Sequence, residues 1–309
     1  MNTQETAAPI IPAGPSAGAA DYVIITPAHN EAAYIEKTII SVVAQTIRPL
    51  KWVIVNDSST DRTPEIVKHY SNEHGFIQLL NIERDGGRHF ANKVRAFNCG
   101  LTELSHLNYE YIGNLDADIF VQDHYYETIL SGFKCDAKLG IAGGMVYTKM
   151  GDKFVTEDGT LDSIGGAVQL FRRRCFQDIG GYLPLPYGGE DAAAEITARM
   201  KGWKVRKDPA LKVFENRRTG SGEPNRIGAR VREGQRMHSL GYDPAFFFMR
   251  CLFRATDSPC IIGSIATLLG YADSLFYRRP VVLSEKVASY LKKEQRGRLK
   301  RLPLTLLGS

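Results

Sequence analysis

The sequence predicts an α/β domain built on a mainly parallel sheet that is flanked by helices. Short apolar runs rich in β-branched residues alternate with segments of helical spacing between residues 21 and 115. Such alternation favours parallel strands joined by right-handed helical crossovers. Ligands gather at the carboxyl ends of the strands in sheets of this kind, and acidic residues recur at those ends here. We therefore expect a functional edge lined with carboxylates.

Composition and length are ordinary for a soluble globular protein with one large domain or two modest ones. The chain has 309 residues, of which 43% are hydrophobic and 24% charged, and its net charge is +5. Five scattered cysteines without a Cys-x-x-Cys pair argue against a disulfide framework or a zinc site and favour a reducing cytoplasm. No apolar run reaches about 18 residues, the length expected of a membrane span. The aromatic and basic interleaving typical of nucleic-acid binding is absent, so nucleic acid is not an expected partner.

Three regions are expected along the chain. Residues 1–20 are rich in Ala, Pro and Gly and lack the features of a signal peptide, which predicts a disordered leader. Residues 21–243 form the expected main domain. Residues 244–309 depart from its pattern and predict a helical, basic extension.

Four strands and three helices are expected in the first half of the main domain. Pro27 should end the first strand, and Asp61 or Thr63 would cap the second helix, which has Pro64 near its start. The expected strands cover residues 21–26, 51–55, 77–82 and 111–115, and the expected helices cover residues 32–45, a segment after residue 63, and residues 90–104.

Paired glycines mark the second half of the main domain. A strand is expected at residues 139–147, interrupted at residues 143–144, and a loop or hairpin at residues 149–162. Residues 165–173 predict a strand that enters a basic turn, and its paired glycines would let a ligand or another backbone approach closely. A helix should follow from Glu190 to Met200, after the glycines at residues 188–189.

The acids that follow successive strands are the first candidates for function. We expect the loops carrying Glu31, Asp57 and Asp118 to converge at one edge of the sheet. Asp116 and Asp118, separated by one residue, suit a hard divalent cation shared with a phosphate, although Asp is also common in surface turns. Glu31 could instead complement a helix dipole, and Asp57 could cap the next helix. A shared rim of carboxylates is costly in self-repulsion unless cations or hydrogen-bond donors use it.

Three further candidates lie on helices. Lys93 would be a diphosphate contact beside the acidic rim, or part of a solvated helix face. Glu190 and Asp191 follow a glycine loop at the start of a helix. They could complement the helix dipole, or one of them could be a general base on a flexible loop, and this segment alone leaves both interpretations open.

Six short motifs in order resemble those of family 2 inverting glycosyltransferases with the GT-A fold, the group that includes bacterial polysaccharide and glycolipid sugar transferases. No single motif is specific, and the strength lies in their order between about residues 21 and 213. The motifs are residues 27–31 (close to P-x-x-N-E), residues 55–61, Lys93 with Asn98 (K-x-x-A-x-N-x-G), residues 116–118 (D-x-D), residues 165–173 leading to residues 180–182, and residues 189–191 with Arg199 and Gly202.

The resemblance implies a role for each matching residue. Asp191 would be the catalytic base and Glu190 would support acceptor or loop placement. Asp118 would bind Mg²⁺ or Mn²⁺ at the diphosphate, with Asp116 at the ribose or in the metal shell. The implied donor nucleotide contacts are Pro27, Ala28, Asn30, Glu31, Asp57, Lys93, Asp116 and Ala117, and the implied acceptor-side residues are Gly165, Gly166 and Ala167.

One motif departs from the family pattern. The family often has a His after the last core strand, and here Glu215 or Asn216 would serve as third metal ligand, with Arg217 or Arg218 contacting phosphate. Residues 219–236 predict either a flexible lid over the donor or an exposed basic loop.

The region after Pro244 combines unusually apolar runs with a basic stretch from Arg278 to Arg301. This pattern suits docking at an anionic membrane surface, on the inner face of the cell membrane. The alternative is a helical pair that packs on its own domain or on a second copy of the chain.

The expected function is metal-dependent, inverting transfer of a sugar from a nucleotide-sugar donor to a hydroxyl of a lipid-linked glycan. The metal and basic side chains would neutralise the leaving diphosphate, and a carboxylate would take the proton of the attacking hydroxyl. Two rivals stay open, namely a sugar nucleotidyltransferase and a catalytically silent nucleotide-sugar-binding subunit. A nucleotidyltransferase usually has a glycine- and arginine-rich loop after its first strand, which is absent here, and the intact Glu190–Asp191 pair argues against the silent subunit.

Overall fold

A computed structural model describes residues 21–83, 91–156, 163–216, 226–254 and 261–301. The chain divides into two compact units, which we call the first unit (Met1–Pro184 and Glu190–Thr219) and the second unit (Leu185–Gly189 and Gly220–Ser309). The expected leader, Arg217, Arg218 and residues 219–225 of the expected lid lie outside the described residues. The second unit thus takes in residues 220–243, which the sequence placed with the main domain.

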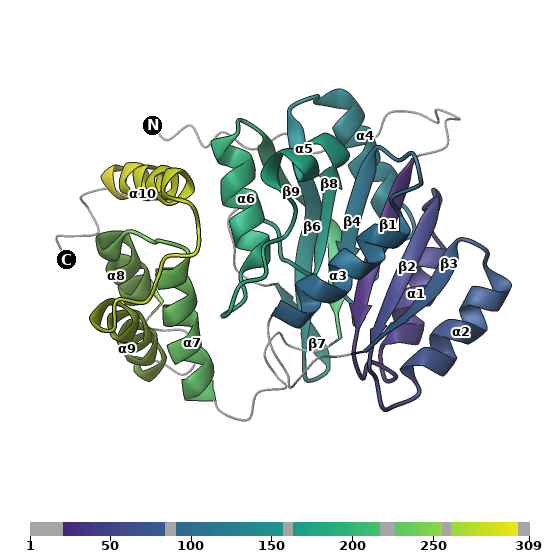
Figure 1. Ribbon diagram of the computed structural model, residues 1–309, viewed down its shortest axis with the longest axis horizontal. Helices are drawn as coiled ribbons and strands as arrows, with labels where there is room; N and C mark the ends of the chain where they lie inside the picture. The colour runs from purple at the N-terminus through teal and green to yellow at the C-terminus, as the bar shows by residue number, and fades with distance from the viewer. Residues whose placement is uncertain (1–20, 84–90, 157–162, 217–225, 255–260, 302–309) are drawn as a thin grey trace. The chain divides into compact units, whose positions relative to one another are not determined.

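One nine-stranded sheet organises the first unit (Figure 1). Its path runs β3-β2-β1-β4-β8-β6-β9-β5, and β7 pairs with β6. Strands β1 to β4 are parallel and β6 is parallel to β9, whereas β8 is antiparallel to both β4 and β6 and β5 is antiparallel to β9. The sheet is therefore mixed, with parallel pairing along most of its path. The strands are β1 (Tyr22–Ala28), β2 (Lys51–Asp57), β3 (Ile77–Ile82), β4 (Tyr111–Leu115), β5 (Ile119–Val121), β6 (Leu139–Met150), β7 (Lys153–Thr156), β8 (Val168–Arg172) and β9 (Lys204–Glu215).

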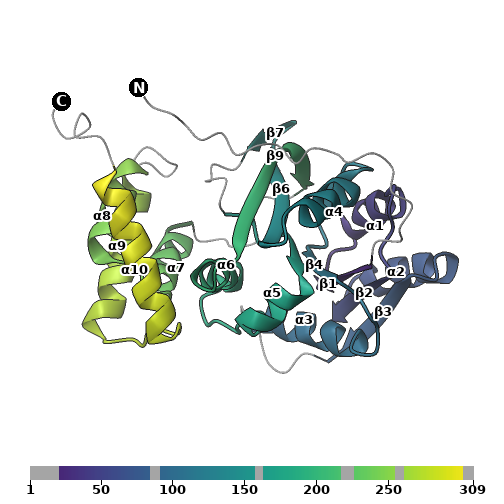
Figure 2. The ribbon, with the colours of Figure 1, turned by 90° about the horizontal axis from the view of Figure 1, so that it is seen from above.

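Helices cover both faces of this sheet (Figure 2). They are α1 (Ile35–Val43), α2 (Thr63–Glu73), α3 (Ala91–Glu103), α4 (Tyr125–Cys135), α5 (Arg173–Ile179) and α6 (Glu190–Met200). Successive residues of β2 point to opposite faces, as the strand period requires. Trp52 and Ile54 pack in the core with α1, α2 and α4, and Val53 and Val55 pack in the core with α3, α5 and α6.

The structure confirms most of the expected elements and corrects several details. The strands at residues 77–82 and 111–115 have the expected bounds, and residues 149–156 form the outer part of the β6–β7 hairpin. Pro27 does not end β1, because it lies within the parallel pairing opposite Val55. The expected basic turn is instead helix α5, which begins at Arg173. Strand β6 continues through residues 143–144, but its pairing with β9 shifts register between Gly144 and Met145, so the expected interruption is an irregularity within the strand. The Gly144 N–H donates to the Tyr125 hydroxyl at 3.0 Å.

The second unit is helical, which confirms the expected C-terminal extension. Its helices are α7 (Arg226–Ser239), α8 (Pro244–Phe253), α9 (Ile262–Phe276) and α10 (Glu285–Lys300). Residues 226–236, expected as part of a lid or loop, form most of α7. Helices α7 and α9 approach closely because Gly234 faces the Thr267 carbonyl and Gly270 faces the Val231 carbonyl, and a Cβ at either glycine would collide with that backbone. Within the described residues, no helix has both the length and the apolar character needed to cross a bilayer.

Candidate active site

The parallel neighbours β2, β1 and β4 bring the candidate loops to one edge of the sheet. Parallel strands end at the same edge, and β1 pairs with β2 on one side and with β4 on the other. Strand β8 is antiparallel to β4, with Val168 opposite Leu115, so the segment that precedes β8 reaches the same edge. Strand β9 ends opposite the start of β5, where Glu215 pairs with Ile119.

The loops after β1 and β2 are joined by hydrogen bonds. His29 Nδ1 donates to the Asp57 carbonyl at 2.7 Å. The Asn30 N–H donates at 3.0 Å to the hydroxyl of Ser59, in the loop after β2, and the Glu31 N–H donates at 2.8 Å to the hydroxyl of Thr63, the first residue of α2. Asn30 adopts a positive φ of 57°, and its Oδ1 accepts from the Thr60 N–H at 2.8 Å. The loops that carry the expected donor-binding residues therefore form one ordered structure.

Three expected donor contacts are largely buried. The side chains of Ala28 and Ala117 are 2% and 4% exposed and belong to the core that faces α1. The carbonyl of Ala117 accepts from the Thr38 hydroxyl at 2.8 Å. Asp57 is also buried, whereas Pro27 is partly exposed. Ala28 and Ala117 therefore pack in the core beneath this edge of the sheet, whereas Pro27 is more accessible to a ligand.

A second group of candidates meets around Asp116. Lys93 Nζ lies 2.7 Å from Oδ1 and 2.8 Å from Oδ2 of Asp116. Asn114 Nδ2 donates to Asp116 Oδ1 at 3.0 Å and to the Gly166 carbonyl at 2.7 Å. The Asp116 N–H donates to the Ala167 carbonyl at 2.8 Å, so the expected acceptor-side segment is attached directly to the end of β4.

Asp191 and Glu190 line a small hollow with this group. Asp191 lies directly against Gly166, because a Cβ built on Gly166 would be 2.6 Å from Asp191 Oδ2 and 2.9 Å from Asp191 Cβ. The lining residues are Lys93, Val94, Phe97, Asn114, Gly166, Tyr182, Glu190 and Asp191. The structure thus brings a lysine, the first acid of the D-x-D motif and the two acids of α6 into one place.

The charges in this hollow are strongly coupled. Burial alone would lower the pKa of Lys93, but the carboxylates of Asp116, Glu190 and Asp191 outweigh it and raise that pKa, so the ammonium stays charged. Burial, with Asp191 and Asp116 nearby, raises the pKa of Glu190 against the opposing effect of Lys93. A permanent cation surrounded by acids suits a site that takes a charged substrate.

Asp118 lies beside the end of β9. The backbone N–H and Nδ2 of Asn216 donate to the Asp118 carbonyl at 3.1 and 3.2 Å, and Glu215 Oε2 accepts from the Thr148 hydroxyl at 2.8 Å. Both expected third ligands, Glu215 and Asn216, therefore lie next to Asp118, where the end of β9 pairs with the start of β5. Within the described ranges, however, no three or more His, Cys, Asp or Glu side chains gather as a ready metal site. Carboxylate oxygens suit Mg²⁺ or Mn²⁺, and the diphosphate of a donor would have to complete the coordination.

The candidates thus fall into three groups along one edge. Asp57 belongs to the β1–β2 loop pair, Asp118 neighbours Glu215 and Asn216, and Asp191 shares the hollow with Asp116. The sequence motifs pointed to all three groups, but they did not show that Lys93 pairs with Asp116.

A buried polar network behind the hollow was not anticipated from the sequence. Glu195 Oε1 accepts from the Ile164 N–H at 2.7 Å and from Gln169 Nε2 at 3.0 Å, and Gln169 Oε1 accepts from the Tyr182 hydroxyl at 2.6 Å. Glu195 is 2% exposed, and burial raises its pKa from 4.5 to about 8. It lies one turn after Asp191 on α6, which is the signal that the sequence offered. The network fixes the segment before β8, against which Asp191 rests.

Glu195→Gln is expected to remove a pH dependence of stability. The folded protein keeps the Glu195 proton up to about pH 8, whereas the unfolded chain releases it near pH 4.5, so wild-type stability falls as the pH rises through this window. Because the variant does not titrate there, its Tm relative to wild type should be about 5 °C higher at about pH 9 than at about pH 5. Glu65→Gln, an exposed change on α2, is the control. A pH-independent difference in Tm would show that Glu195 is ionised in the fold throughout.

Comparison with known proteins gives the family. The chain belongs to glycosyl transferase family 2, because the model of that family matches residues 23–180, just over half of the chain. Among curated relatives, the poly-beta-1,6-N-acetyl-D-glucosamine synthase of Staphylococcus aureus (strain COL) is 25% identical over 200 residues, and that of Staphylococcus epidermidis is 24% identical. Each alignment covers 59% of this chain and 46% of the relative, so the chain spans about half the length of these proteins.

Solved structures confirm the GT-A fold. The mannosyltransferase PcManGT from Pyrobaculum calidifontis, in complex with GDP-Man and Mn²⁺, has a TM-score of 0.53 at 17% identity and covers 91% of this chain and 81% of its own. GalNAc-T7 with UDP, GalNAc and Mn²⁺ has a TM-score of 0.55 at 13% identity, with 86% of this chain and 59% of its own covered. Residues 1–349 of TarS from S. aureus, in complex with UDP-GlcNAc, give 0.50 at 16% identity, covering 69% and 64%.

Proposed function

We propose that this protein is an inverting glycosyltransferase that moves a sugar from a nucleoside-diphosphate sugar to a hydroxyl of a glycan acceptor. The observation that carries the proposal is the hollow in which Asp191 and the Lys93–Asp116 pair lie together. It combines a carboxylate, which can take a proton, with a permanent cation, which can stabilise a leaving diphosphate. Family membership and the nucleotide sugars bound by the structural relatives support the same reaction.

The reaction is a single displacement at the anomeric carbon. The acceptor oxygen attacks that carbon while its proton passes to a carboxylate oxygen of Asp191. The bond between the anomeric carbon and the diphosphate oxygen breaks on the opposite side, and its electron pair leaves with the nucleoside diphosphate. Lys93 lies where it can offset part of that negative charge. One displacement inverts the anomeric centre.

We propose that Mg²⁺ or Mn²⁺ is the cofactor and that Asp118 is its main protein ligand. Such an ion would act as a Lewis acid that neutralises the diphosphate. Asp116 is already paired with Lys93 on both oxygens, so we assign it to positioning the lysine and the donor rather than to direct metal ligation. The Mn²⁺ in two structural relatives supports a divalent ion.

Asp118→Ala is expected to remove the Mn²⁺-dependent part of donor affinity. The substitution deletes the carboxylate proposed to hold the ion against the diphosphate, and calorimetric titration of a nucleotide sugar with and without Mn²⁺ measures the loss. Asp152→Ala, in the exposed turn between β6 and β7, is the matched control. If Mn²⁺ strengthens donor binding equally in the variant and in wild type, Asp118 is not the ligand.

We infer that the acceptor is a lipid-linked glycan in polysaccharide synthesis and that the protein is peripheral on the inner face of the cell membrane. The curated relatives are synthases of a polysaccharide, which supports the acceptor class. The excess of basic residues after Pro244 supports attraction to an anionic membrane surface.

A panel of nucleotide sugars tests the function. With Mn²⁺ present, the matching donor should raise the Tm, because a ligand that binds only the folded state stabilises it. That donor should then release a nucleoside diphosphate when a glycan acceptor is added. Release of pyrophosphate would indicate a sugar nucleotidyltransferase instead, and donor binding without turnover on any acceptor would indicate a silent subunit.

A further inference from the structure

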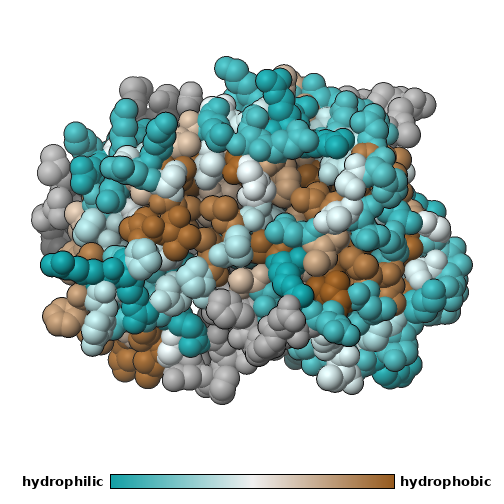
Figure 3. All heavy atoms as spheres, in the orientation of Figure 1, coloured by the Kyte–Doolittle hydropathy of each residue, from teal (hydrophilic) through white to brown (hydrophobic). Residues whose placement is uncertain are grey.

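Glu195 is the most deeply buried glutamate in the part of the chain that the structure describes, and the proposed reaction gives it no role. Its side chain is 2% exposed, whereas Figure 3 shows hydrophilic residues over much of the face that it draws. Glu195 lies four residues after Asp191 on α6, so the two carboxyls share one side of the helix. A buried acid beside the proposed base needs a physical explanation.

Residues 164–167, the expected acceptor-side segment, are attached to the sheet on one side and to α6 on the other. The end of β4 holds the first side through hydrogen bonds to the carbonyls of Gly166 and Ala167, at 2.7 and 2.8 Å. Glu195 holds the second side, where its Oε1 accepts from the Ile164 N–H at 2.7 Å. Through Glu195, the helix that carries the proposed base also fixes the segment on which that base rests.

Glu195 also holds part of the wall of the reaction hollow. Its Oε1 accepts from Gln169 Nε2 at 3.0 Å, and Gln169 Oε1 accepts from the hydroxyl of Tyr182, which lines the hollow, at 2.6 Å. The Tyr182 ring packs edge-on against Phe97 and Phe171, with ring centroids 5.0 and 5.5 Å apart. Both the ring and the hydroxyl of Tyr182 are therefore fixed, and Glu195 lies at the inner end of this chain of hydrogen bonds.

The surroundings of Glu195 favour its neutral form. Burial raises the pKa of Glu195 to about 8, and the nearby carboxylate of Asp191 acts in the same direction. The hydrogen bonds that Glu195 accepts and the guanidinium of Arg199, whose Nη1 lies 3.8 Å from Oε2, oppose this rise. Burial and the neighbouring acids raise the pKa of Tyr182, so its hydroxyl stays neutral. Glu195 therefore keeps its proton at neutral pH and loses it as the pH rises through about 8.

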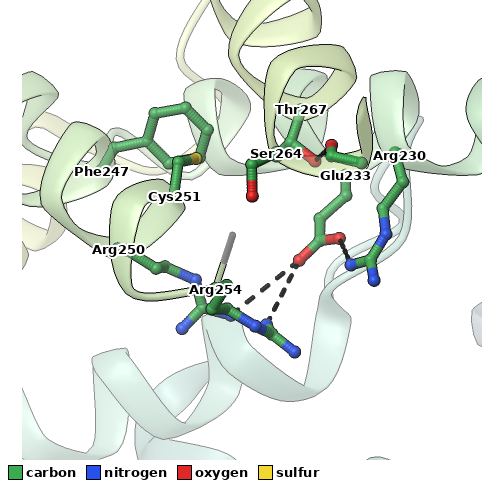
Figure 4. Close-up of a pocket in the computed structure, with 9 residues that line it drawn as sticks. Arg230, Glu233, Phe247, Arg250, Cys251, Arg254, Ser264 and Thr267 are labelled. Atoms are coloured by element: carbon green, nitrogen blue, oxygen red, sulfur yellow. Dashed lines mark hydrogen bonds and ion pairs between the residues drawn. The ribbon is translucent and has the colours of Figure 1, made fainter. Parts of the chain in front are cut away.

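Glu233 on α7, in the second unit, shows the opposite behaviour (Figure 4). Arg230 Nη1 lies 2.9 Å from Glu233 Oε2. Arg254 and Arg250 lie 3.6 and 3.9 Å from Glu233 Oε1. Burial would raise the pKa of Glu233, but the Arg230 hydrogen bond and the neighbouring arginines lower it, so this carboxylate is ionised at neutral pH. Glu233 is therefore a matched control for Glu195, because it is a largely buried glutamate that does not titrate near pH 8.

We propose that Glu195 is a positioning residue for the sugar transfer, and that it holds residues 164–167 in place for Asp191 only while its carboxyl is neutral. The inference rests on the proposed function, because it concerns the placement of the proposed base. An ionised carboxylate at this buried position must gain water or move, which loosens the segment that it holds. It also adds a negative charge one helical turn from Asp191. Transfer should therefore weaken at alkaline pH, whereas donor affinity should stay the same.

The pH dependence of kcat tests this inference. Wild-type kcat should fall about tenfold between about pH 7 and about pH 9, because a group with a pKa of about 8 keeps its proton in only about one molecule in ten at the higher pH. Glu195→Gln keeps an acceptor oxygen and does not ionise. The ratio of its kcat to that of wild type should therefore rise from about 1 to about 10 over this range. Other titrating groups affect both proteins alike and cancel in the ratio.

Glu233→Gln makes the same chemical change in the second unit, and the ratio of its kcat to that of wild type should not change with pH. A ratio for Glu195→Gln that stays constant between about pH 7 and about pH 9 would overturn the inference. An equal rise in the ratio for both variants would also overturn it, because the effect would then not be specific to Glu195.

Glu195→Ala removes both hydrogen bonds to Oε1 at every pH. At about pH 7 it should lower kcat at least about tenfold, because a small displacement at a reacting group is costly, while calorimetric titration should find donor affinity within about twofold of wild type. Glu195→Gln should keep wild-type kcat at this pH. Folded Glu195→Ala protein with kcat close to wild type would overturn the positioning role. The pH test needs only Glu195→Gln, so it applies even if Glu195→Ala does not fold. Absence of transfer by wild type at every pH would instead contradict the proposed function, and this inference with it.

Discussion

Asp191→Asn is expected to lower kcat by at least about a hundredfold while donor affinity stays within about twofold of wild type. A positioned general base contributes about 10²- to 10⁴-fold, and the amide of Asn cannot take the acceptor proton. The side chain is nearly isosteric, so it should keep its place against Gly166. Transfer of radiolabelled sugar and calorimetric titration of the donor measure the two effects separately.

Two further variants define what this result means. Asp152→Asn makes the same chemical change in an exposed turn and should leave kcat unchanged. Glu190→Gln changes the neighbouring acid in the same hollow and should have the smaller effect, since we assign Glu190 to placement. If Asp191→Asn retains turnover within about tenfold of wild type, Asp191 is not the base. A larger loss in Glu190→Gln than in Asp191→Asn would exchange the two roles.

Much of the first unit's fold could be predicted from residue patterns. Strands β3 and β4 are short segments of mainly apolar residues between turn residues, so the sequence located them without error. The hydropathy pattern could not show that β8 is antiparallel to β4 and β6, because the direction of a strand depends on the strands with which it pairs. The sequence analysis missed helix α5 because its first two residues, Arg173 and Arg174, are basic and do not show the apolar spacing typical of a helix. The helix is stabilised by the packing of Cys175 and Phe176 against the sheet, which the sequence alone does not show.

The candidate site was predicted as a set of residue types and not as a geometry. Motif order was enough to name Lys93, Asp116 and Asp191, which the structure places in one hollow. It was not enough to predict that Lys93 binds both oxygens of Asp116, because that pairing depends on how α3 lies against the end of β4. The Glu195 network was missed for a related reason: a buried carboxylate resembles a surface one in sequence until its partners are known.

Gly166→Ala is expected to lower kcat about a hundredfold with little change in donor affinity. A Cβ at residue 166 would lie 2.6 to 2.9 Å from three atoms of the Asp191 side chain, and real contacts of a Cβ are longer. Gly166 is not among the residues with positive φ, so alanine can adopt its backbone conformation and the collision itself is what must be relieved. The base would have to move, and a displacement of about 1 Å at a reacting group can cost about a hundredfold.

Gly165→Ala is the matched control for this displacement. Its Cβ would meet only a methyl group of Val146, at 3.2 Å, and that side chain can yield by a few tenths of an ångström. We therefore expect Gly165→Ala to keep kcat within about threefold of wild type, and both variants to melt cooperatively. If Gly166→Ala is as active as Gly165→Ala, the close contact with Gly166 does not set the position of Asp191. If both variants lose turnover to the same extent, the whole segment before β8 affects the acceptor, and the loss in Gly166→Ala is not specific to the position of Asp191.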